Sequence, residues 1–481
     1  SRSMANELHF PLFHGYVDRW LVSGVTETPV ITKPTALHGA ENEKLNTAPK
    51  DKPGEEQFKA ERRAKATAWP AQLDTRPGGL VGGADNATPF TVYWPFDDIG
   101  VTYAWDCETP ACLSAWAYTE LDAAEAGSVP FDLITCGGAA LWLNGEKLTE
   151  VTPYHHNEPV PTPLTLPLQK GRNKLLVFFD NYAERDATII LRLRWKGEGT
   201  APEQVIPAGE ADAARLAEAE HLMRSLAFHR NHFTAGPVLL DYDGADIAES
   251  YHLAFVGGTE ENVKGGVLFR READTLPHAS QISLGDCKTF PLAFLLLQVT
   301  TEVEGIRLTR PISVEIHTES VLPRALPTVA ERKRQALELL ARWGEQNTNR
   351  ALAILATGGD TAEAEKLLAV QSDYIRRRFD CSDFYLVYYP YILRTFGKRG
   401  SGILSEKTEN ELTDCLLGFR YWIDEPGNDA MWFWSENHAL MFHTCQLLAG
   451  ELFPDEVFTN SGLTGRQMQA KAKNMLYDWF V

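Results

Sequence analysis

The sequence predicts a multidomain α+β protein in which two antiparallel β-sandwich, jelly-roll-like domains precede a helical domain of the α/α-toroid type. Three observations predict this: a length of 481 residues, a period of two in hydrophobicity over residues 91–195 and again over 236–320, and a helical period from residue 329 onward. One hydrophobic core rarely serves so long a chain, so several domains are expected. We place them at residues 1–200, 201–325 and 326–481.

The composition indicates a folded, acidic protein. Hydrophobic residues make up 44% of the chain, and 46 basic against 65 acidic residues give a net charge of −19. Such a charge repels nucleic acids and anionic membranes. The sequence also contains no apolar run of about 18 residues that could span a bilayer. We therefore expect neither nucleic acid nor a membrane as a partner.

The cysteines and the N-terminus indicate a cytoplasmic protein. The seven cysteines are odd in number and show no CxxC spacing, as expected for reduced thiols. The first four residues resemble a cloning remnant that ends at a native Met, and the residues after them lack the features of a signal peptide. His155 and His156 form a vicinal pair that rarely chelates without further ligands, so we expect no metal and no cofactor.

The first domain begins with a short strand at 20–24 and a polar insertion at 32–79, which we interpret as a surface excursion carrying a helix at 55–65. Residues Asn144 and Gly145 tolerate positive φ and should close a hairpin. The alternating segments after the insertion predict strands at 91–94, 101–105, 113–119, 131–135, 140–143, 173–179 and 188–195.

Two segments of this domain carry a resemblance. The residues Trp142, Asn144 and Gly145, followed by Gly171, Asn173 and Leu175, form a W-x-N-G … G-x-N-x-L pattern. This pattern is similar to that of the galactose-binding-like jelly rolls that accompany many glycoside hydrolases. The resemblance implies a sandwich fold and, in many such accessory domains, a structural role.

The second domain begins with a predicted amphipathic helix at 211–230, which we expect to bridge the two sandwiches. Strands are predicted at 238–242, 251–256, 267–270, 290–300 and 306–315. Residues 292–299 are nearly continuously apolar, as in a strand that is buried on both faces.

The third domain contains six segments with helical periodicity, separated by Gly, Pro or Asp. They cover residues 329–356, 362–379, 384–396, 406–422, 436–451 and 465–480. Helices of this length in hairpin pairs suggest an α/α toroid. A complete six-hairpin toroid would need twice as many helices, so we expect an incomplete one.

The segment that concentrates chemistry is W-F-W-S-E-N-H at 432–438, directly before the fifth of these helices. Together with residues 418–427 and 449–465, it resembles a little-described bacterial family that has a W-S-E-N-H helix start. It is also similar to the helical toroids of polysaccharide lyases and some glycoside hydrolases. The resemblance implies an oligosaccharide or polysaccharide substrate.

The residue types at this segment suit proton abstraction. If Ser435 caps the helix, then Glu436, Asn437 and His438 occupy its first turn, where the positive end of the helix dipole disfavours a protonated imidazole. A neutral His438 can act as a base. Asn437 could bind the carboxylate of a uronate, so that developing negative charge is stabilised.

The remaining roles are assigned by residue type. A tyrosine would protonate the leaving oxygen, and among Tyr385, Tyr388, Tyr389 and Tyr391 we choose Tyr388. Arg394 and Arg420, with the run 376–378, offer charge for a uronate. Trp432 and Trp434 would stack on sugar rings.

These readings have alternatives. His438 could instead be a helix-start residue bonded to a neighbouring carbonyl, and Trp432 and Trp434 could be core anchors. We interpret His443 as a core residue.

We therefore predict a carbohydrate-active enzyme that cleaves an acidic, uronate-containing oligo- or polysaccharide by β-elimination. The second hypothesis is a glycoside hydrolase in which Glu436 is the general acid and a carboxylate such as Asp424 or Asp383 is the base. The third is a non-catalytic carbohydrate-binding or scaffold protein.

Overall fold

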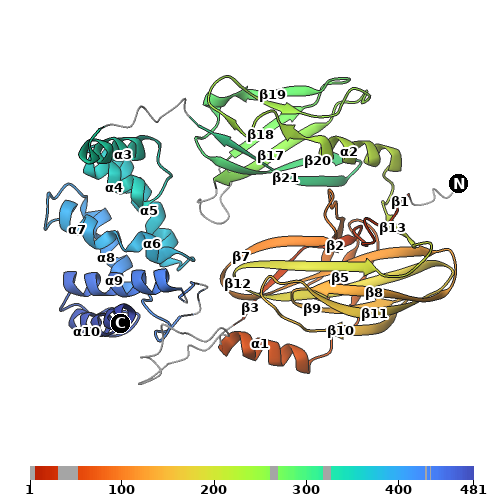
Figure 1. The fold of residues 1–481 in the computed structure, drawn as a ribbon, viewed down its shortest axis with the longest axis horizontal. Helices are drawn as coiled ribbons and strands as arrows, with labels where there is room; N and C mark the ends of the chain where they lie inside the picture. Colours follow the sequence, from red (N-terminus) through yellow and green to blue (C-terminus); the bar gives the residue numbers. More distant parts are fainter. Residues whose placement is uncertain are drawn as a thin grey trace.

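The computed structural model describes residues 6–30, 53–259, 269–317, 327–427, 429, 431–433 and 435–481. Two β-rich domains lie one above the other in Figure 1, and a column of helices stands beside them. Antiparallel sheets followed by a helical C-terminal part are therefore confirmed as the architecture. Trp434 lies outside the described residues.

The first domain is a sandwich built around two very long strands. Its strands are β1 (Glu7–Phe10), β2 (Leu21–Ser23), β3 (Thr26–Pro29), β4 (Gln72–Leu73), β5 (Leu80–Gly82), β6 (Thr88–Val92), β7 (Val101–Ala123), β8 (Gly127–Thr135), β9 (Gly138–Leu143), β10 (Glu146–Val151), β11 (Val160–Leu168), β12 (Gly171–Trp195) and β13 (Glu203–Pro207). The first half of β12 pairs with β9 and its last residues pair with β8, so this one strand belongs to both layers.

One feature of the predicted strands is wrong, namely the breaks between 101–105 and 113–119 and between 173–179 and 188–195. Each pair is a single strand, and β7 and β12 pair with each other from Val101 with Leu191 to Ala123 with Gly171. Polar residues interrupt the alternation in the middle, where the register shifts between Ala183 and Arg185. A bulge of this kind keeps the ladder while breaking the period.

The predicted hairpin at Asn144 and Gly145 is confirmed. Both residues have positive φ, 50° and 86°, and they join β9 to β10. The predicted strand at 20–24 is also confirmed as β2, which lies between β6 and β7.

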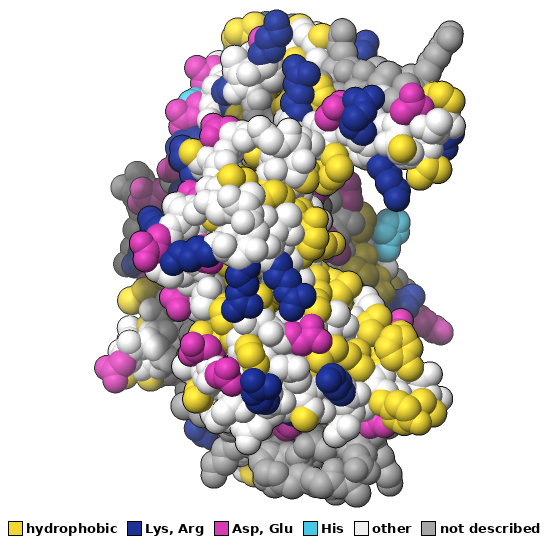
Figure 2. Space-filling model, turned by 90° about the vertical axis from the view of Figure 1, so that its left-hand side faces the viewer, with side chains coloured by type: hydrophobic (Ala, Val, Ile, Leu, Met, Phe, Trp, Pro, Cys, Tyr) yellow, Lys and Arg dark blue, Asp and Glu magenta, His cyan; other side chains and the backbone are white. Residues whose placement is uncertain are grey.

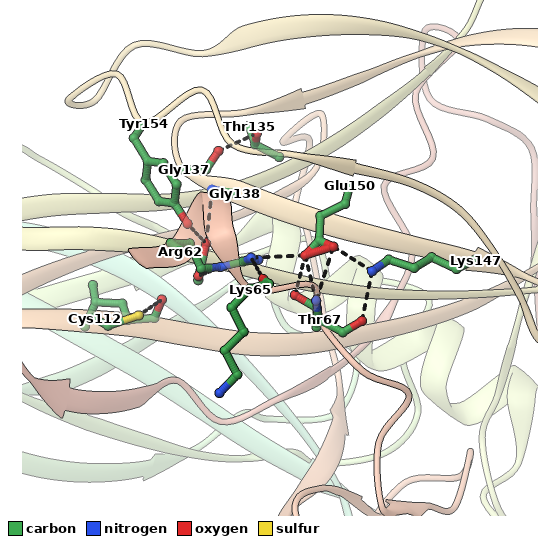
Figure 3. Close-up of polar contacts among 12 residues, drawn as sticks. Arg62, Lys65, Thr67, Cys112, Thr135, Gly137, Gly138, Lys147, Glu150 and Tyr154 are labelled. Atoms are coloured by element: carbon green, nitrogen blue, oxygen red, sulfur yellow. Dashed lines mark hydrogen bonds and ion pairs between the residues drawn. The ribbon is translucent and has the colours of Figure 1, made fainter. Parts of the chain in front are cut away.

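Helix α1 (Pro53–Ala64) confirms the helix predicted in the polar insertion, and a buried polar cluster fixes it to the sandwich. Arg62 Nε donates to Asp180 Oδ2 at 2.8 Å, and Arg62 Nη1 donates to Glu150 Oε1 at 3.0 Å. Figure 3 shows Arg62 lying between Tyr154 and Glu150. The other Asp180 oxygen accepts from Gly138 N at 3.1 Å and from the Tyr154 hydroxyl at 2.7 Å.

Glu150 completes this α1 cluster on its other side. It accepts from Lys147 Nζ at 2.5 Å and from the Thr67 hydroxyl at 2.6 Å, as Figure 3 shows. Burial opposes ionisation of Glu150, but the bonds from Lys147, Thr67 and Arg62 outweigh it and lower the pKa to about 2. Glu150 therefore stays charged in all but strongly acidic solution.

The second domain contains two sheets and helix α2 (Ala213–Ser225), which packs on the five-stranded sheet. Its elements are β14 (Ala227–Phe228), β15 (His232–Phe233), β16 (Pro237–Asp241), β17 (His252–Thr259), β18 (Phe269–Asp274), β19 (Gln281–Asp286), the 3-10 helix η3 (Cys287–Thr289), β20 (Phe294–Val303) and β21 (Ile306–Ile316). The sheet orders are β14-β16-β19 and β15-β21-β20-β17-β18. The helix predicted to reach residue 230 ends earlier, because the chain there forms β14.

The two sandwiches share contacts, as the predicted bridging helix requires. Glu220 of α2 forms an ion pair of 2.7 Å with Arg19 of the first domain, and both side chains are about nine-tenths buried. The Trp94 indole donates to the carbonyl of Arg307 at 3.1 Å. A single hydrophobic core contains buried residues of both domains.

The prediction that residues 292–299 form a strand buried on both faces is wrong. In β20 the residues alternate, so that Leu295 and Leu297 are buried while Phe294 and Leu296 are 41% and 50% exposed. The sheet has one covered face, and the apolar run reflects hydrophobic residues on the uncovered face as well.

The third domain is helical throughout. Its helices are α3 (Val329–Trp343), α4 (Thr348–Ala356), α5 (Thr361–Arg376), α6 (Ser382–Leu386), α7 (Tyr389–Phe396), α8 (Glu406–Gly418), α9 (Glu436–Leu452) and α10 (Gly465–Phe480). Figure 1 shows them stacked from α3 to α10 beside the two sandwiches, with α6 and α9 on the side of the first sandwich. A toroid stays a prediction.

Three predicted helix boundaries in this domain are wrong. The segment 329–356 is two helices, because Asn347 caps a new helix by accepting from Asn349 N and Arg350 N. The segment 384–396 is likewise split into α6 and α7, with Pro390 in the first turn of α7. Helix α8 ends at Gly418 instead of 422, because Phe419 has extended backbone.

Three further properties concern the described residues as a whole. No described helix is both long and apolar enough to cross a membrane. In the same part of the chain, no group of three or more His, Cys, Asp or Glu side chains is placed to hold a metal ion. All seven cysteines are described, and no disulfide joins them.

Candidate active site

The candidate site lies at the start of α9, and the predicted cap is confirmed. The Ser435 hydroxyl accepts from His438 N at 3.4 Å, so Glu436, Asn437 and His438 do form the first helical turn. The residues of this turn differ in burial, because Glu436 and Asn437 are exposed whereas His438 is only 6% exposed. The helix start therefore presents a carboxylate and an amide to solvent above a buried imidazole.

His438 is paired with a carboxylate from α6. Its Nδ1 lies 2.8 Å from Asp383 Oδ2, and Asp383 is 1% exposed. With the carboxylate ionised, Nδ1 carries the proton and Nε2 is left as the basic nitrogen. The Phe384 ring, 4.6 Å from the imidazole between centroids, holds its other side.

The Asp383 carboxylate is buried and only partly hydrogen-bonded. Its other oxygen, Oδ1, is buried and has no hydrogen-bond partner in the described part of the chain. Burial raises the pKa of Asp383, and the bond and charge of His438 work in the opposite direction. The carboxylate is thus held by one imidazole, in contrast to the several donors around Asp180.

The amide of Asn437 is oriented by the helix start. Its Oδ1 accepts from His438 N at 2.9 Å and also from the Ser435 hydroxyl. Because the oxygen is engaged and the residue is exposed, the amino group Nδ2 is the part of the side chain that can still donate a hydrogen bond. It can donate to an acceptor on a ligand.

The turn before α6 has unusual backbone. Arg378 and Cys381 both have positive φ, 53° and 69°, although neither is glycine. Such conformations cost free energy and persist where surrounding contacts fix them. Between them Asp380 accepts from Trp432 N at 2.8 Å, which places the partly buried Trp432 beside the turn that carries Asp383.

The loop leading to Trp432 is fixed by Arg420. This guanidinium is buried and donates to the carbonyls of Ile423 and Glu425 at 3.0 and 2.9 Å. It also contacts both oxygens of Asp429, at 3.3 and 3.2 Å. Arg420 therefore holds the loop, and its donors are directed at protein groups.

Arg394 lies far from the imidazole. It forms an ion pair of 3.6 Å with Glu451, near the opposite end of α9 from His438. Thirteen residues (438 to 451) separate Glu451 from His438 on this helix, which corresponds to about 20 Å at 1.5 Å per residue. The structure thus does not bring Arg394 together with the candidate base.

Tyr388 is 37% exposed at the junction of α6 and α7, and no described contact joins it to His438. Tyr385 packs edge-on against Tyr374, whose hydroxyl donates to the Asp380 carbonyl at 2.5 Å. Of the four tyrosines considered, Tyr385 thus connects to the turn that carries Asp383. Tyr389 is fully buried and bonded to Ser372 at 2.8 Å.

His443 is buried, as predicted for a core residue. Its ring lies 4.4 Å from that of Trp422, and its Nδ1 has no hydrogen-bond partner among the described residues. Burial, with a smaller contribution from the charge of Lys471, lowers the pKa of His443 to about 4. It stays neutral at physiological pH.

Comparisons with known proteins add little. No family model matches the chain, and no curated protein matches it. Among solved structures the chain is similar to a β-glucuronidase of Ruminococcus gnavus in complex with uronic isofagomine (9% identity, 65% of this chain and 44% of that chain, TM-score 0.15). It is also similar to a β-glucuronidase of Parabacteroides merdae (10%, 77% and 48%, 0.16) and a β-glycosidase of Bacteroides vulgatus (10%, 64% and 34%, 0.15).

The chain spans less than half the length of these three proteins. Identities and TM-scores of this size establish no activity for this chain. The resemblance to a family with the W-S-E-N-H signature stays a prediction.

Proposed function

We propose that the protein is a carbohydrate-active enzyme that cleaves a uronate-containing oligo- or polysaccharide by β-elimination, with His438 as the base. The observation that carries the proposal is the 2.8 Å pair between His438 Nδ1 and Asp383 Oδ2. A carboxylate on Nδ1 fixes the tautomer that leaves Nε2 free of the proton, and it stabilises the imidazolium that forms when Nε2 takes a proton.

The surroundings of His438 suit the other demands of this reaction. The base removes the proton next to the substrate carboxyl group, and the C–O bond of the leaving sugar breaks to give an unsaturated product. The amino group of Asn437 and the positive end of α9 would stabilise the negative charge that develops on the carboxylate. Tyr388 or Tyr385 would protonate the leaving oxygen, and Trp432 would contact a sugar ring.

The backbone of the neighbouring turn supports a functional site here. Arg378 and Cys381, both in the left-handed region, lie on either side of Asp380, which accepts from Trp432 N, and Cys381 is two residues before Asp383. Strain of this kind concentrates at active sites, because the geometry is maintained for function.

The hydrolase hypothesis is less well supported. Glu436 is exposed, as an acid at a site could be, but its possible partners are already engaged. Asp383 pairs with His438, and Asp424 forms an ion pair of 2.7 Å with Lys471. A base for hydrolysis should be able to contact water.

The test is an ultraviolet assay of unsaturated product on uronate-containing oligosaccharides, comparing the wild type with His438→Ala. We expect the absorbance change to fall by about a hundredfold or more in the variant, as for loss of a general base. The matched control is His229→Ala, because His229 forms an equally short pair with Asp241 at 2.8 Å but is exposed.

Three results would contradict the proposal. Equal loss in the control would mean that the assay reports general damage. New reducing ends without absorbance would indicate hydrolysis, with Glu436 as the residue to test next. Binding of oligosaccharide without any product would indicate a binding protein.

A further inference from the structure

Two carboxylates that are close together in the sequence hold the two sides of the start of α9. Asp380, in the turn before α6, accepts a hydrogen bond at its Oδ1 from Trp432 N at 2.8 Å. Asp383, in the first turn of α6, lies with its Oδ2 2.8 Å from His438 Nδ1. Trp432 precedes α9 and His438 belongs to its first turn. The same short segment of chain is therefore bonded both to the aromatic loop and to the candidate base.

The turn that carries Asp380 is itself fixed by α5. The Tyr374 hydroxyl of α5 donates to the Asp380 carbonyl at 2.5 Å. The Tyr374 ring lies 4.8 Å from the ring of Phe379 and 6.1 Å from that of Tyr385, between centroids, and Phe379 is buried. The position of the Asp380 carboxylate is thus set by contacts on the far side of the turn from Trp432.

The loop before α9 is anchored by Phe433, the residue next to Trp432. Phe433 is 2% exposed, and its ring lies 4.5 Å from that of Phe442 on α9. The Arg420 guanidinium lies 5.1 Å from the centre of the Phe433 ring. Trp432 itself is half-buried. Phe433 therefore fixes how deeply the loop lies, and the bond from Trp432 N to Asp380 fixes the peptide from which the Trp432 side chain projects.

We infer that Asp380 is a positioning residue that acts through Trp432 in substrate binding, whereas Asp383 acts through His438 in the chemical step. The Asp380 bond ties the Trp432 main chain to the segment that also holds the base. A sugar ring packed on the indole then lies at a defined distance from the imidazole, which is the geometry that a productive complex requires. This inference rests on the proposed function, because it concerns the same site.

The division of roles predicts a separation of KM from kcat. Asp380→Ala should raise KM about five- to tenfold, as for the loss of one hydrogen bond that orders a binding group, and should change kcat by less than about twofold. Asp380→Asn keeps an acceptor oxygen for Trp432 N although it removes the charge, so it should recover most of the loss in KM. The measurement is the rate of absorbance increase against concentration, with short oligogalacturonates, oligoglucuronans and oligoalginates as probes.

The matched control is Glu365→Ala. Glu365 of α5 is also a half-buried carboxylate that accepts from a distant main-chain nitrogen, that of Ser405 at 2.7 Å, but Ser405 caps α8. Figure 2 shows acidic and basic side chains interspersed over the outer face of the helical domain, so the loss of either carboxylate changes the charge of this domain similarly. We expect KM to change by less than about twofold in this control. An equal rise in both variants would overturn the inference.

A double-mutant cycle tests whether Asp380 acts through Trp432. Trp432→Ala should raise KM at least as much as Asp380→Ala. Combining the two should add less than about a further twofold, because the ring that the hydrogen bond orients is already missing. Additive effects would overturn the inference, and so would a KM for Asp380→Asn as high as that for Asp380→Ala, since charge would then be the cause. Circular dichroism and thermal unfolding verify that each variant is folded.

Calorimetry of oligosaccharide binding to His438→Ala, with and without Asp380→Ala, separates this inference from the proposed function. Weaker binding on addition of Asp380→Ala, without any absorbance change in the wild type, would retain the positioning role and refute elimination. Product that depends on His438, with KM unchanged in Asp380→Ala, would retain elimination and overturn the positioning role. Failure of the wild type to bind any of the three classes of oligosaccharide would overturn both.

Discussion

Two of the buried charged groups in the described residues differ in how their carboxylates are bonded: the α1 cluster on the first sandwich, and the pair of His438 and Asp383 at the start of α9. In the first, Asp180 accepts hydrogen bonds from Arg62, Gly138 and Tyr154. In the second, Asp383 has one partner and a buried oxygen without any in the described structure. A carboxylate that is fully bonded fixes a fold, whereas one that is bonded on a single side can respond to a change of charge on its partner.

The largest effect on stability is expected at the α1 cluster. Asp180→Asn should reduce the free energy of unfolding by about 2–4 kcal/mol, because it removes one of the two carboxylates that balance the buried guanidinium of Arg62 and leaves Glu150 as the other. Urea unfolding checks this, with Asp455→Asn as the control, since its pair with Arg466 is exposed and is expected to contribute about 0–1 kcal/mol. Equal losses in both variants would show that the cluster has no special role.

At the second group the expected effect is on activity. Asp383→Asn should lower the rate of elimination by about a hundredfold or more, because an amide does not fix the imidazole tautomer or stabilise its protonated form. The cost in unfolding free energy should be smaller than for Asp180→Asn, because one bond of Asp383 is involved. A stability loss larger than that of Asp180→Asn, with activity retained, would reverse the comparison.

Mild acid should distinguish the two regions. The pKa of His443 falls from 6.5 to about 4 on folding, so the unfolded chain binds a proton more readily below pH 6.5. Neutral, buried His443 makes its full contribution to the free energy of unfolding above pH 6.5. This contribution is lost as the pH falls from 6.5 to 4, by at most about 3 kcal/mol. Glu150, with its pKa lowered to about 2, retains its contribution in this range and loses it as the pH falls from about 4.5 toward 2.

Hydrogen exchange at pH 7.5 and pH 5 measures this difference by region. Peptides of α9 should lose protection at pH 5 while peptides of β12 and α1 keep theirs, and His443→Met should remove much of the pH dependence in α9. The raised pKa values of Asp383 and Glu425 act in the opposite direction, since these groups gain protons in the folded state. Unchanged pH dependence in His443→Met would exclude His443 as the cause.

The smallest expected effect concerns the strained turn. Cys381→Gly should stabilise the protein by about 1 kcal/mol or less, because glycine adopts a φ of 69° without steric cost, although it also increases the freedom of the unfolded chain. Thermal unfolding checks the sign. A clear loss of stability would mean that contacts of the Cys381 side chain outweigh the backbone strain.

The sequence predicted helices and strands more successfully than it predicted which distant side chains pair with one another. Period-two segments located the sheets, and the cap at Ser435 located the first turn of α9, because both signals are local. The pairing of His438 with Asp383 spans 55 residues, and that of Arg62 with Asp180 spans 118. No spacing in the sequence encodes such distances, which depend on how helices and strands pack.

The errors have the same origin. The apolar run at 292–299 could not distinguish a strand buried on both faces from one with hydrophobic residues on an exposed face, since that depends on what covers the sheet. The middle of β12 looked like a break because its polar residues interrupt the alternation, although β7 continues to pair with it. Arg420 was predicted to bind a ligand because of its residue type. Its hydrogen bond to Asp429 depends on the conformation of the loop between them, which the sequence does not reveal.

The pairing of β1 with β13 sets the order in which the chain can fold during synthesis. Glu7 lies opposite Pro207, so the first strand has to wait for 200 further residues before its partner exists. Until then its edge is open to other chains, whereas the helices of the third domain form from neighbouring residues as they emerge. We therefore expect the first sandwich to be the slow, chaperone-dependent step of biogenesis, even though it carries the more strongly bonded of the two charged groups.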